Sequence, residues 1–305
     1  MTQSQRASVA VLGLGPMGAA LAQAFLDADV STTVWNRSLA RADDMVGHGA
    51  TAASQAQAAV ESADLVVVCL RDHTVVREVL GGIEAAAYTD RTVLNLSSST
   101  PHEARRTAEW ATERGITYLT GAIMVPTPLI GDPSALILYS GDRAVFERHV
   151  GRLRILAGTA DYLGVDPGLA SLYDVGMLEI FFAGMTSFLH AAAMVTAQGV
   201  DAATFLPYAR QIAALLPDTF LSLARDVDGG SYSGDEDRLA MELAVLEHIA
   251  HTSDEVGLDS GLPRLMRDLA GRAVDAGHGD DGFSRLVETL RRGQHGLRHG
   301  VAPRR

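Results

Sequence analysis

The chain has 305 residues, of which 47% are hydrophobic and 20% charged, a balance that suits a globular protein with two domains. Its net charge of −12 disfavours a nucleic-acid partner or an anionic membrane surface. All 25 basic residues are arginine, which excludes any mechanism that needs a lysine acid, base or Schiff base.

Short apolar strands alternate with helical segments through the first half of the chain. The expected strands are 7–13, 32–37, 64–70, 92–97, 116–124 and 135–141. The expected helices are 16–28, 39–48, 73–80, 102–114 and 143–157. This alternation predicts βαβ units in a doubly wound, mostly parallel sheet, which is a Rossmann domain over residues 1–165.

The pattern changes after Asp166-Pro167-Gly168, and no further strand is evident. A long helix is expected at 169–198, and because it is largely apolar on all sides we expect it to be buried. Further helices are expected at 202–227, 236–256, 261–277 and 283–292. The predicted fold class is therefore α/β, with an all-α domain over residues 166–292, a long interdomain helix and a flexible tail at 293–305.

A glycine-rich turn joins the first strand to the first helix. Its sequence is Gly13-Leu14-Gly15-Pro16-Met17-Gly18, a G-x-G-x-x-G motif in the strand-to-helix context that it requires. Gly13 permits the turn, Gly15 lets the backbone approach a pyrophosphate, and Gly18 lets helix and strand pack closely. The motif predicts a dinucleotide site at the helix N-terminus; a glycine-rich turn without a ligand is the alternative.

The second strand ends at Trp35-Asn36-Arg37-Ser38, without the acidic residue that usually accepts the ribose hydroxyls of NAD. Arg37, Ser38 and Arg41 follow instead, and guanidinium groups fit a 2′-phosphate. The sequence thus favours NADP(H) over NAD. The alternative is that both arginines are solvated charges at the start of a helix.

Two later strand ends should face the same crevice, because ligands bind outside the carboxyl ends of parallel strands. The first holds Cys69 and Leu70, where we expect Cys69 to pack within the strand. The second offers polar candidates for the nicotinamide ribose or amide, namely Asn95, Ser97 and Ser98. Ser99 and Thr100 could instead cap the following helix.

A Rossmann domain, a boundary glycine and a long apolar helix together resemble the β-hydroxyacid dehydrogenase superfamily. Members carry a general acid/base lysine near the start of that helix, with an asparagine a few residues later. The matching stretch here, GLASLYDVGML at 168–178, has neither. The resemblance therefore supports the fold and puts hydroxyacid chemistry in doubt.

A closer resemblance, over nearly the whole chain, is to the NADP-dependent imine reductases. It is carried by GLGPMGAALAQAFL (13–26), VWNRSLAR (34–41), NLSSSTPHEAR (95–105), YLGVDPGLASLYD (162–174) and LEHIAHTSDEVGLDSGLPR (246–264). It implies hydride transfer from NADPH to the C=N bond of cyclic imines, and reductive amination as a further activity. It also implies a homodimer with intertwined helical domains. An NADP-dependent 3-hydroxyacid or aldehyde dehydrogenase and a non-catalytic NADPH sensor are the alternatives.

The same resemblance implies that Asp174 is the proton donor. Its expected neighbours Leu172, Val175, Met177 and Leu178 would desolvate the carboxyl, which raises its pKa, and the ionised form would stabilise an iminium cation. Asp174 facing solvent or capping a helix turn is one alternative, and Tyr173 as donor is the other. Because consecutive helix residues point about 100° apart, only one of the two should face the cofactor.

The expected substrate pocket is apolar, although each of its residues could equally be plain core. Its candidates are Met124, Met177, Ile180, Phe181 and Phe182. Thr120 stands where many relatives carry aspartate. Glu247, His248 and His251 lack a clear further ligand, so no metal is expected. The lone cysteine, and the lack of a recognisable secretory signal or of eighteen consecutive apolar residues, favour a cytoplasmic location.

Overall fold

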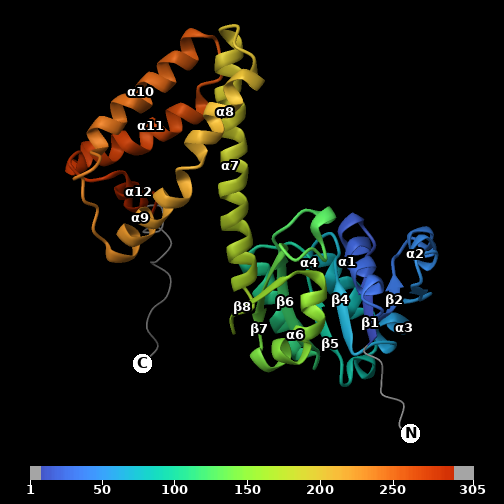
Figure 1. Cartoon of the computed structure of the whole chain (residues 1–305). Helices are drawn as coiled ribbons and strands as arrows, with labels where there is room; N and C mark the ends of the chain where they lie inside the picture. The colour runs from blue at the N-terminus through green and yellow to red at the C-terminus, as the bar shows by residue number, and fades with distance from the viewer. Residues whose placement is uncertain (1–7, 292–305) are drawn as a thin grey trace, which may run out of the picture. The chain divides into compact units, whose positions relative to one another are not determined.

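The computed structural model describes residues 8–291 (Figure 1). The chain divides into two compact units, and the boundary between them in the sequence falls between Ile180 and Phe181. We call the first the sheet unit and the second the helical unit. The tail expected at 293–305 lies outside the described residues.

The sheet unit contains eight strands in the order β3-β2-β1-β4-β5-β6-β7-β8. Every neighbouring pair is parallel except β6 and β7. The strands are β1 Ser8–Leu12, β2 Ser31–Trp35, β3 Thr51–Ala52, β4 Leu65–Val68, β5 Thr92–Asn95, β6 Thr117–Ile123, β7 Leu136–Gly141 and β8 Thr159–Gly164. The predicted doubly wound, mostly parallel sheet is confirmed. The strand order reverses on either side of β1, and this reversal positions a crevice between the carboxyl ends of β1 and β4.

Helices pack on both faces of this sheet (Figure 1). They are α1 Pro16–Asp27, α2 Leu39–Val46, α3 Ala56–Glu61, α4 His73–Gly81, α5 Pro101–Glu113 and α6 Arg143–Leu156. One apolar core forms around Phe25, Leu153 and Tyr139, and a second forms around Val76 and Ala111. Because both faces are covered, β4 is continuously apolar, and so is β1 after its first residue, Ser8.

Two strands and one α-helix of this unit were not predicted, namely β3, β8 and α3, and neither were the short 3-10 helices Ala85–Tyr88 and Thr127–Leu129. Strand β3 has only two residues, both exposed, so it carries no periodic signal. Helix α3 has six residues, too few for a clear helical period. Strand β8, TADYLG, is partly exposed at the sheet edge and mixes polar with apolar residues.

The helical unit has no strand among its described residues. Its helices are α8 Ala202–Ala213, α9 Leu216–Gly229, α10 Leu239–Glu255, α11 Gly261–Ala273 and α12 Leu286–Arg291, together with the second half of α7, Leu169–Ala197. The single helix expected at 202–227 is wrong. Two helices form because Pro217 opens α9, where a proline ring and its missing N–H prevent continuation of α8.

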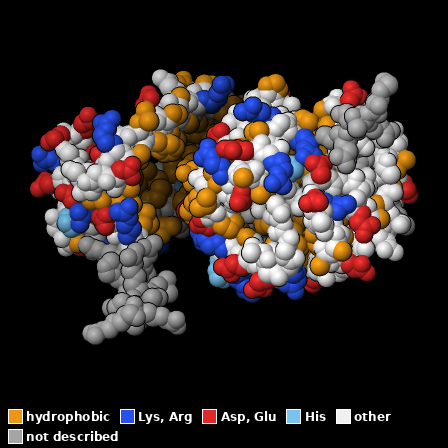
Figure 2. Space-filling model, turned by 90° about the horizontal axis from the view of Figure 1, so that it is seen from below, with side chains coloured by type: hydrophobic (Ala, Val, Ile, Leu, Met, Phe, Trp, Pro, Cys, Tyr) orange, Lys and Arg blue, Asp and Glu red, His pale blue; other side chains and the backbone are white. Residues whose placement is uncertain are grey.

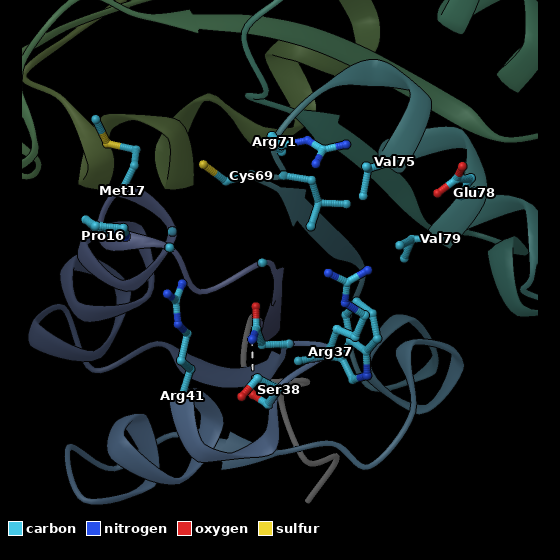
Figure 3. Close-up of a pocket in the computed structure, with 16 residues that line it drawn as sticks. Pro16, Met17, Arg37, Ser38, Arg41, Cys69, Arg71, Val75, Glu78 and Val79 are labelled. Carbon is cyan, nitrogen blue, oxygen red and sulfur yellow. Dashed lines mark hydrogen bonds between the residues drawn. The ribbon is translucent and has the colours of Figure 1, made fainter.

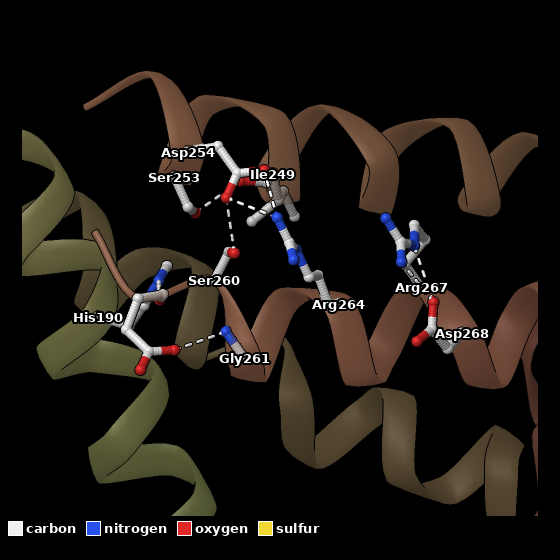
Figure 4. Close-up of polar contacts among 10 residues, drawn as sticks. His190, Ile249, Ser253, Asp254, Ser260, Gly261, Arg264, Arg267 and Asp268 are labelled. Carbon is white, nitrogen blue, oxygen red and sulfur yellow. Dashed lines mark hydrogen bonds and ion pairs between the residues drawn. The ribbon is translucent and has the colours of Figure 1, made fainter. Parts of the chain in front are cut away.

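Polar contacts fix the turn between α10 and α11 (Figure 4). The Asp254 carboxylate accepts hydrogen bonds from Ser260 Oγ at 2.7 Å and from Arg264 at 2.9 Å. The Gly261 N–H donates to Asp259 at 2.7 Å, and a ring nitrogen of His190 on α7 lies 3.1 Å from the Asp259 carbonyl oxygen. These contacts tie the far end of α7 to the start of α11.

The expectation that α7 is buried is wrong for the single chain. Only 6% of its most apolar 18-residue window is buried, and Ile180, Phe181 and Phe182 are each more than half exposed. Figure 2 shows hydrophobic side chains gathered on the surface of the helical unit. By length and composition α7 could cross a membrane, which alone is a weak indication. The all-round apolar pattern reflects a surface that this chain does not cover by itself.

Candidate active site

A groove of about 910 Å³ opens at the carboxyl ends of β1, β2 and β4. Most of the predicted cofactor residues line it, namely Gly13, Gly15, Pro16, Met17, Gly18, Asn36, Arg37, Ser38, Arg41, Cys69 and Leu70. Figure 3 shows the guanidinium groups of Arg37 and Arg41 pointing into the groove from the segment after β2. The wall opposite that segment includes Val75 and Val79, which the sequence analysis did not single out.

The glycine-rich turn has the geometry that its motif predicts. Gly13 has a φ of +99°, and a Cβ there would lie 2.3 Å from the Cys69 carbonyl oxygen. A Cβ on Gly18 would lie 1.9 Å from the Gly13 carbonyl oxygen, so strand and helix pack too closely for any side chain. A Cβ on Gly15 would meet nothing within 4 Å. Gly15 therefore leaves open the space in front of the α1 N-terminus, where free N–H groups favour an anion.

Asn36 and Arg41 brace this turn from β2 and α2. Asn36 Oδ1 accepts a hydrogen bond from the Leu14 N–H at 3.0 Å, and Arg41 donates to the Leu14 carbonyl oxygen at 3.2 Å. Leu14 itself is buried and does not line the groove, so its side chain belongs to the core. Within residues 8–291, no hydrogen bond or ion pair engages the exposed Arg37 guanidinium, which leaves it available to a ligand.

A second cavity, of about 270 Å³, adjoins the groove and shares Met17, Cys69, Leu70 and Arg71 with it. Its other walls come from the ends of β5 and β6 and from the start of α7. They are Leu96, Ser97, Ser98, Ser99, Gly121, Ala122, Ile123, Ser171 and Asp174. Five elements, α1, β4, β5, β6 and α7, thus bring together residues that are far apart in the sequence.

Asp174 is the carboxylate of this cavity. It is 7% exposed, and burial raises its pKa above the usual carboxyl range. The expected neighbours do not bury it, because Leu172, Val175, Met177 and Leu178 are between 38% and 48% exposed. The helix face shared by Ser171 and Asp174 turns toward the sheet, and the apolar side chains of α7 point away. Tyr173 is half exposed and does not line the cavity.

Several polar contacts hold the start of α7 against the sheet. The Arg105 guanidinium on α5 pairs with Asp166 in a two-pronged contact, Nε to Oδ1 at 2.8 Å and NH2 to Oδ2 at 2.7 Å. The Asp166 carboxylate also accepts from the Gly168 N–H at 2.9 Å. Ser99 and Ser171 place their hydroxyl oxygens 3.0 Å apart. The sequence marked this region only as a Pro-Gly break and did not indicate these contacts.

The remaining candidates lie in different places. Ser97 and Ser98 line the second cavity, whereas Asn95 is buried beneath it and lines neither cavity. Thr100 caps α5 with a reciprocal contact to Glu103. The expected pocket residues Met124, Met177, Ile180, Phe181 and Phe182 line neither cavity. Met124 packs beside Ala122 and Leu138 instead.

Burial raises the pKa of the Cys69 thiol to about 11, so it is protonated and poorly nucleophilic. Across residues 8–291, no group of three or more His, Cys, Asp or Glu side chains is arranged to hold a metal ion. His251 lies 3.2 Å from Glu255, one helical turn on. Asp174 is the carboxylate that lines the second cavity, beside the groove.

Comparison with known proteins matches both halves of the chain. Residues 8–164 match the NAD binding domain of 6-phosphogluconate dehydrogenase, and residues 166–292 match the C-terminal domain family described as NADPH-dependent reductive aminase-like. An NADPH-dependent reductive aminase from Aspergillus oryzae is 33% identical over 94% of this chain and 98% of its own length.

Solved structures agree with that similarity. An imine reductase from Bacillus cereus BAG3X2 superposes with a TM-score of 0.87 at 41% identity, covering 94% of this chain and 99% of its own. A reductive aminase from Aspergillus terreus, in complex with NADPH4, cyclohexanone and allyl amine, superposes with a TM-score of 0.87 at 35% identity. It covers 94% of this chain and all of its own.

Proposed function

The chain belongs to the family of NADPH-dependent imine reductases and reductive aminases, and we propose that Asp174 is the group that supplies a proton or negative charge to the imine nitrogen. As an oxidoreductase of this family, it reduces C=N bonds with NADPH. The observation that carries the proposal is a buried carboxylate in a cavity that shares four lining residues with the dinucleotide groove.

The residues of the groove fit a phosphorylated dinucleotide. Gly15 leaves room for a pyrophosphate at the α1 N-terminus, and Arg37 and Arg41, which line the same groove, would bind the ribose 2′-phosphate. NADPH, when bound, supplies the hydride. Ser97 and Ser98 would hydrogen-bond its nicotinamide end, since they line the cavity that contains Asp174.

The protein's own residues would supply the proton, or the compensating negative charge, at the imine nitrogen. An imine carbon accepts hydride readily only when the nitrogen is protonated or hydrogen-bonded to an acid. Because burial raises the pKa of Asp174, its carboxyl holds a proton at a higher pH than an exposed aspartate does. After the proton is given up, the carboxylate faces the cationic nitrogen in a water-poor site, where Coulomb attraction is strong.

Substitution of Asp174 tests this role. In an NADPH-oxidation assay with 2-methylpyrroline, Asp174→Asn should lower kcat by about 10²–10⁴-fold, the usual contribution of a general acid. The KM for NADPH should change by less than about threefold, because uniform cofactor binding is kept. Tyr173→Phe is the matched control and should keep the wild-type rate. A fully active Asp174→Asn, or an inactive Tyr173→Phe, would overturn the assignment.

The pH profile offers an independent check. The donor must be protonated, so kcat should fall as pH rises through the raised pKa of Asp174. The limb should disappear in Asp174→Asn. A wild-type profile that is flat on that side would contradict proton donation by this residue.

The substrate range separates the remaining functions. We expect turnover of the cyclic imine and, as a further activity, of a cyclohexanone and allyl amine mixture, the pair present in the relative's structure. Turnover of a 3-hydroxyacid or an aldehyde without any imine reduction would favour the dehydrogenase. Tight NADPH binding without turnover of any of these would favour a sensor. The absence of lysine argues against the hydroxyacid reaction.

We also propose that the protein is a cytoplasmic homodimer with intertwined helical domains. The apolar surface of α7 supports this, since Ile180, Phe181 and Phe182 remain exposed in the single chain. A second copy that covers this surface would remove a large apolar area from water. Light scattering after gel filtration should give twice the mass of the chain. An active species with the mass of one chain would refute the dimer.

A further inference from the structure

A buried hydrogen-bonded network adjoins Ser97, and none of its three central residues lines either cavity. Asn95, expected from the sequence to contact the nicotinamide end, belongs to this network instead. His73 opens α4, Asn95 ends β5, and Thr107 lies in α5. All three side chains are at most 1% exposed. A polar cluster so fully removed from water must have its hydrogen bonds satisfied, so its geometry is closely defined.

The hydrogen-bond directions in this network follow from one backbone donor. The Ser97 N–H lies 3.0 Å from one end of the Asn95 amide, so that end must be the oxygen. The amide nitrogen therefore donates to the Tyr118 hydroxyl at 2.8 Å and toward His73 Nε2 at 3.0 Å. His73 Nε2 also lies 3.3 Å from the Ser97 carbonyl oxygen, but the shorter contact is the one from the Asn95 amide nitrogen, which can only donate. We therefore assign Nε2 as the acceptor, which leaves the proton on Nδ1, 2.9 Å from Thr107 Oγ1.

The ring is suited to this neutral tautomer. Burial lowers the pKa of His73, which disfavours the doubly protonated form. The Arg77 guanidinium, which donates to Thr107 Oγ1 at 2.8 Å, opposes a second positive charge in the same place. Glu103 attracts such a charge, and burial outweighs it.

The network connects directly to the cavity wall. Asn95 Oδ1 holds the Ser97 N–H, and Ser97 Oγ in turn accepts a hydrogen bond from the Leu70 N–H at 2.9 Å. Ser97 and Leu70 both line the cavity that contains Asp174. The ends of β4 and β5 are thereby joined through side chains at the point where the parallel backbone pairing stops.

We propose that His73, acting through Asn95, is a positioning residue for the reaction. The acceptor at Nε2 holds the Asn95 amide in the one orientation that fixes the Ser97 and Leu70 wall opposite the acid. His73 touches no reacting atom. The proposal rests on the proposed function, because the position of that wall affects turnover only if the reaction takes place beside Asp174.

Two substitutions at His73 separate positioning from packing. In His73→Gln the side-chain oxygen reaches the ε position and still accepts from Asn95. In His73→Asn the side chain reaches only the δ position, where it serves Thr107 and leaves Asn95 without its acceptor. Misplacement of a reacting site by about 1 Å can cost about 10²-fold in rate, so His73→Asn should lower kcat at least about tenfold. His73→Gln should stay within about threefold of wild type.

Thermal melting accompanies both variants, so that kcat is compared per folded enzyme. Equal kcat values in His73→Gln and His73→Asn, whatever their stability, would overturn the proposal and leave a packing role. If His73→Asn does not fold, Asn95→Asp provides the same comparison. It keeps an acceptor for the Ser97 N–H and removes the donor to His73, so a wild-type kcat in that variant would overturn the proposal.

The fluorescence of bound NADPH keeps this test independent of the proposed function. The emission should be altered in His73→Asn and unchanged in His73→Gln, because the cavity wall moves only in the former. If the wild-type protein reduces no imine, the proposed function fails, and this comparison still decides the role of His73. Identical emission from both variants would overturn it.

Discussion

Arg37 and Arg41 both enter the dinucleotide groove, but only Arg41 also holds the glycine-rich turn, through its 3.2 Å hydrogen bond to the Leu14 carbonyl oxygen. Replacing each arginine with alanine should therefore change cofactor use in a different way. Arg37→Ala should weaken the use of NADPH and spare NADH, which lacks the 2′-phosphate. Arg41→Ala should weaken both cofactors, because the turn that receives the pyrophosphate loses a brace.

The expected size of the Arg37→Ala effect follows from the exposure of the Arg37 side chain. A hydrogen bond to a charged group contributes about 1.5–3 kcal/mol, and the exposed Arg37 belongs at the lower end of that range. About 1.4 kcal/mol corresponds to tenfold, so Arg37→Ala should lower kcat/KM for NADPH about tenfold. The assay is a set of initial rates with NADPH and NADH at a fixed imine concentration. Equal losses with both cofactors in Arg37→Ala would refute the reasoning, since Arg37 would then act on the turn and not on the phosphate.

Two alanine variants of the glycine-rich turn should differ in their effects. Gly15→Ala should melt at the wild-type temperature, because its Cβ meets no protein atom within 4 Å. It should bind NADPH at least about tenfold more weakly, because that Cβ enters the space expected for the pyrophosphate. Gly18→Ala should lose about 1–3 kcal/mol of stability, because its Cβ would lie 1.9 Å from the Gly13 carbonyl oxygen. A wild-type melting temperature in this variant would contradict the close packing. Burial and the Arg152 charge lower the pKa of His149 to about 4, below the value of about 6.5 in the unfolded chain. Between these two pH values the unfolded chain binds more protons than the folded one, so the stability of the fold falls as pH drops from about 6.5 to about 4. Urea unfolding should show a loss of at most about 3 kcal/mol in the free energy of unfolding over this range. The loss should be smaller in His149→Gln, which keeps a hydrogen-bonding group for Thr92. An unchanged pH dependence in this variant would exclude His149 as its source. Gly168→Ala would bring its Cβ to 2.7 Å from the Arg105 guanidinium carbon, and displacing that partly exposed pair with Asp166 should lower the melting temperature only slightly. Its kcat per folded enzyme should fall, because Asp174 lies in the second turn of the helix that the pair anchors. An unchanged kcat would show that the anchor does not matter to catalysis.

Much of the sheet unit could be predicted because its signals are local. A buried parallel strand is a short apolar run, and the turn between β1 and α1 needs glycine at Gly13 and Gly18 for steric reasons that act over a few residues. The edge strands β3 and β8 escaped prediction because they are short or partly exposed, and so carry no clear apolar period. Pro217 divides a predicted helix for an equally local reason, which the apolar pattern alone did not show.

The surroundings of Asp174 depended on long-range packing. Its neighbours along the chain are apolar, yet Leu172 and Val175 point away from it, and the walls of its cavity come from Leu70, Ser97 and Gly121. The contacts that place it, from Arg105 to Asp166 and from Ser99 to Ser171, join residues 61 and 72 positions apart. The network of His73 and Asn95 is likewise assembled from three separate elements.

The sequence by itself determined the fold class and the glycine-rich turn, and it singled out Asp174 as the candidate acid. Periodicity, glycine sterics and a shared motif all depend on residues that are neighbours in the chain. Only the tertiary structure decided which side of α7 carries the acid inward, what desolvates it, and that the apolar remainder of the helix stays uncovered. A helix that is apolar all round has no preferred face in its own pattern, so the choice of face is made by the surfaces that pack against it.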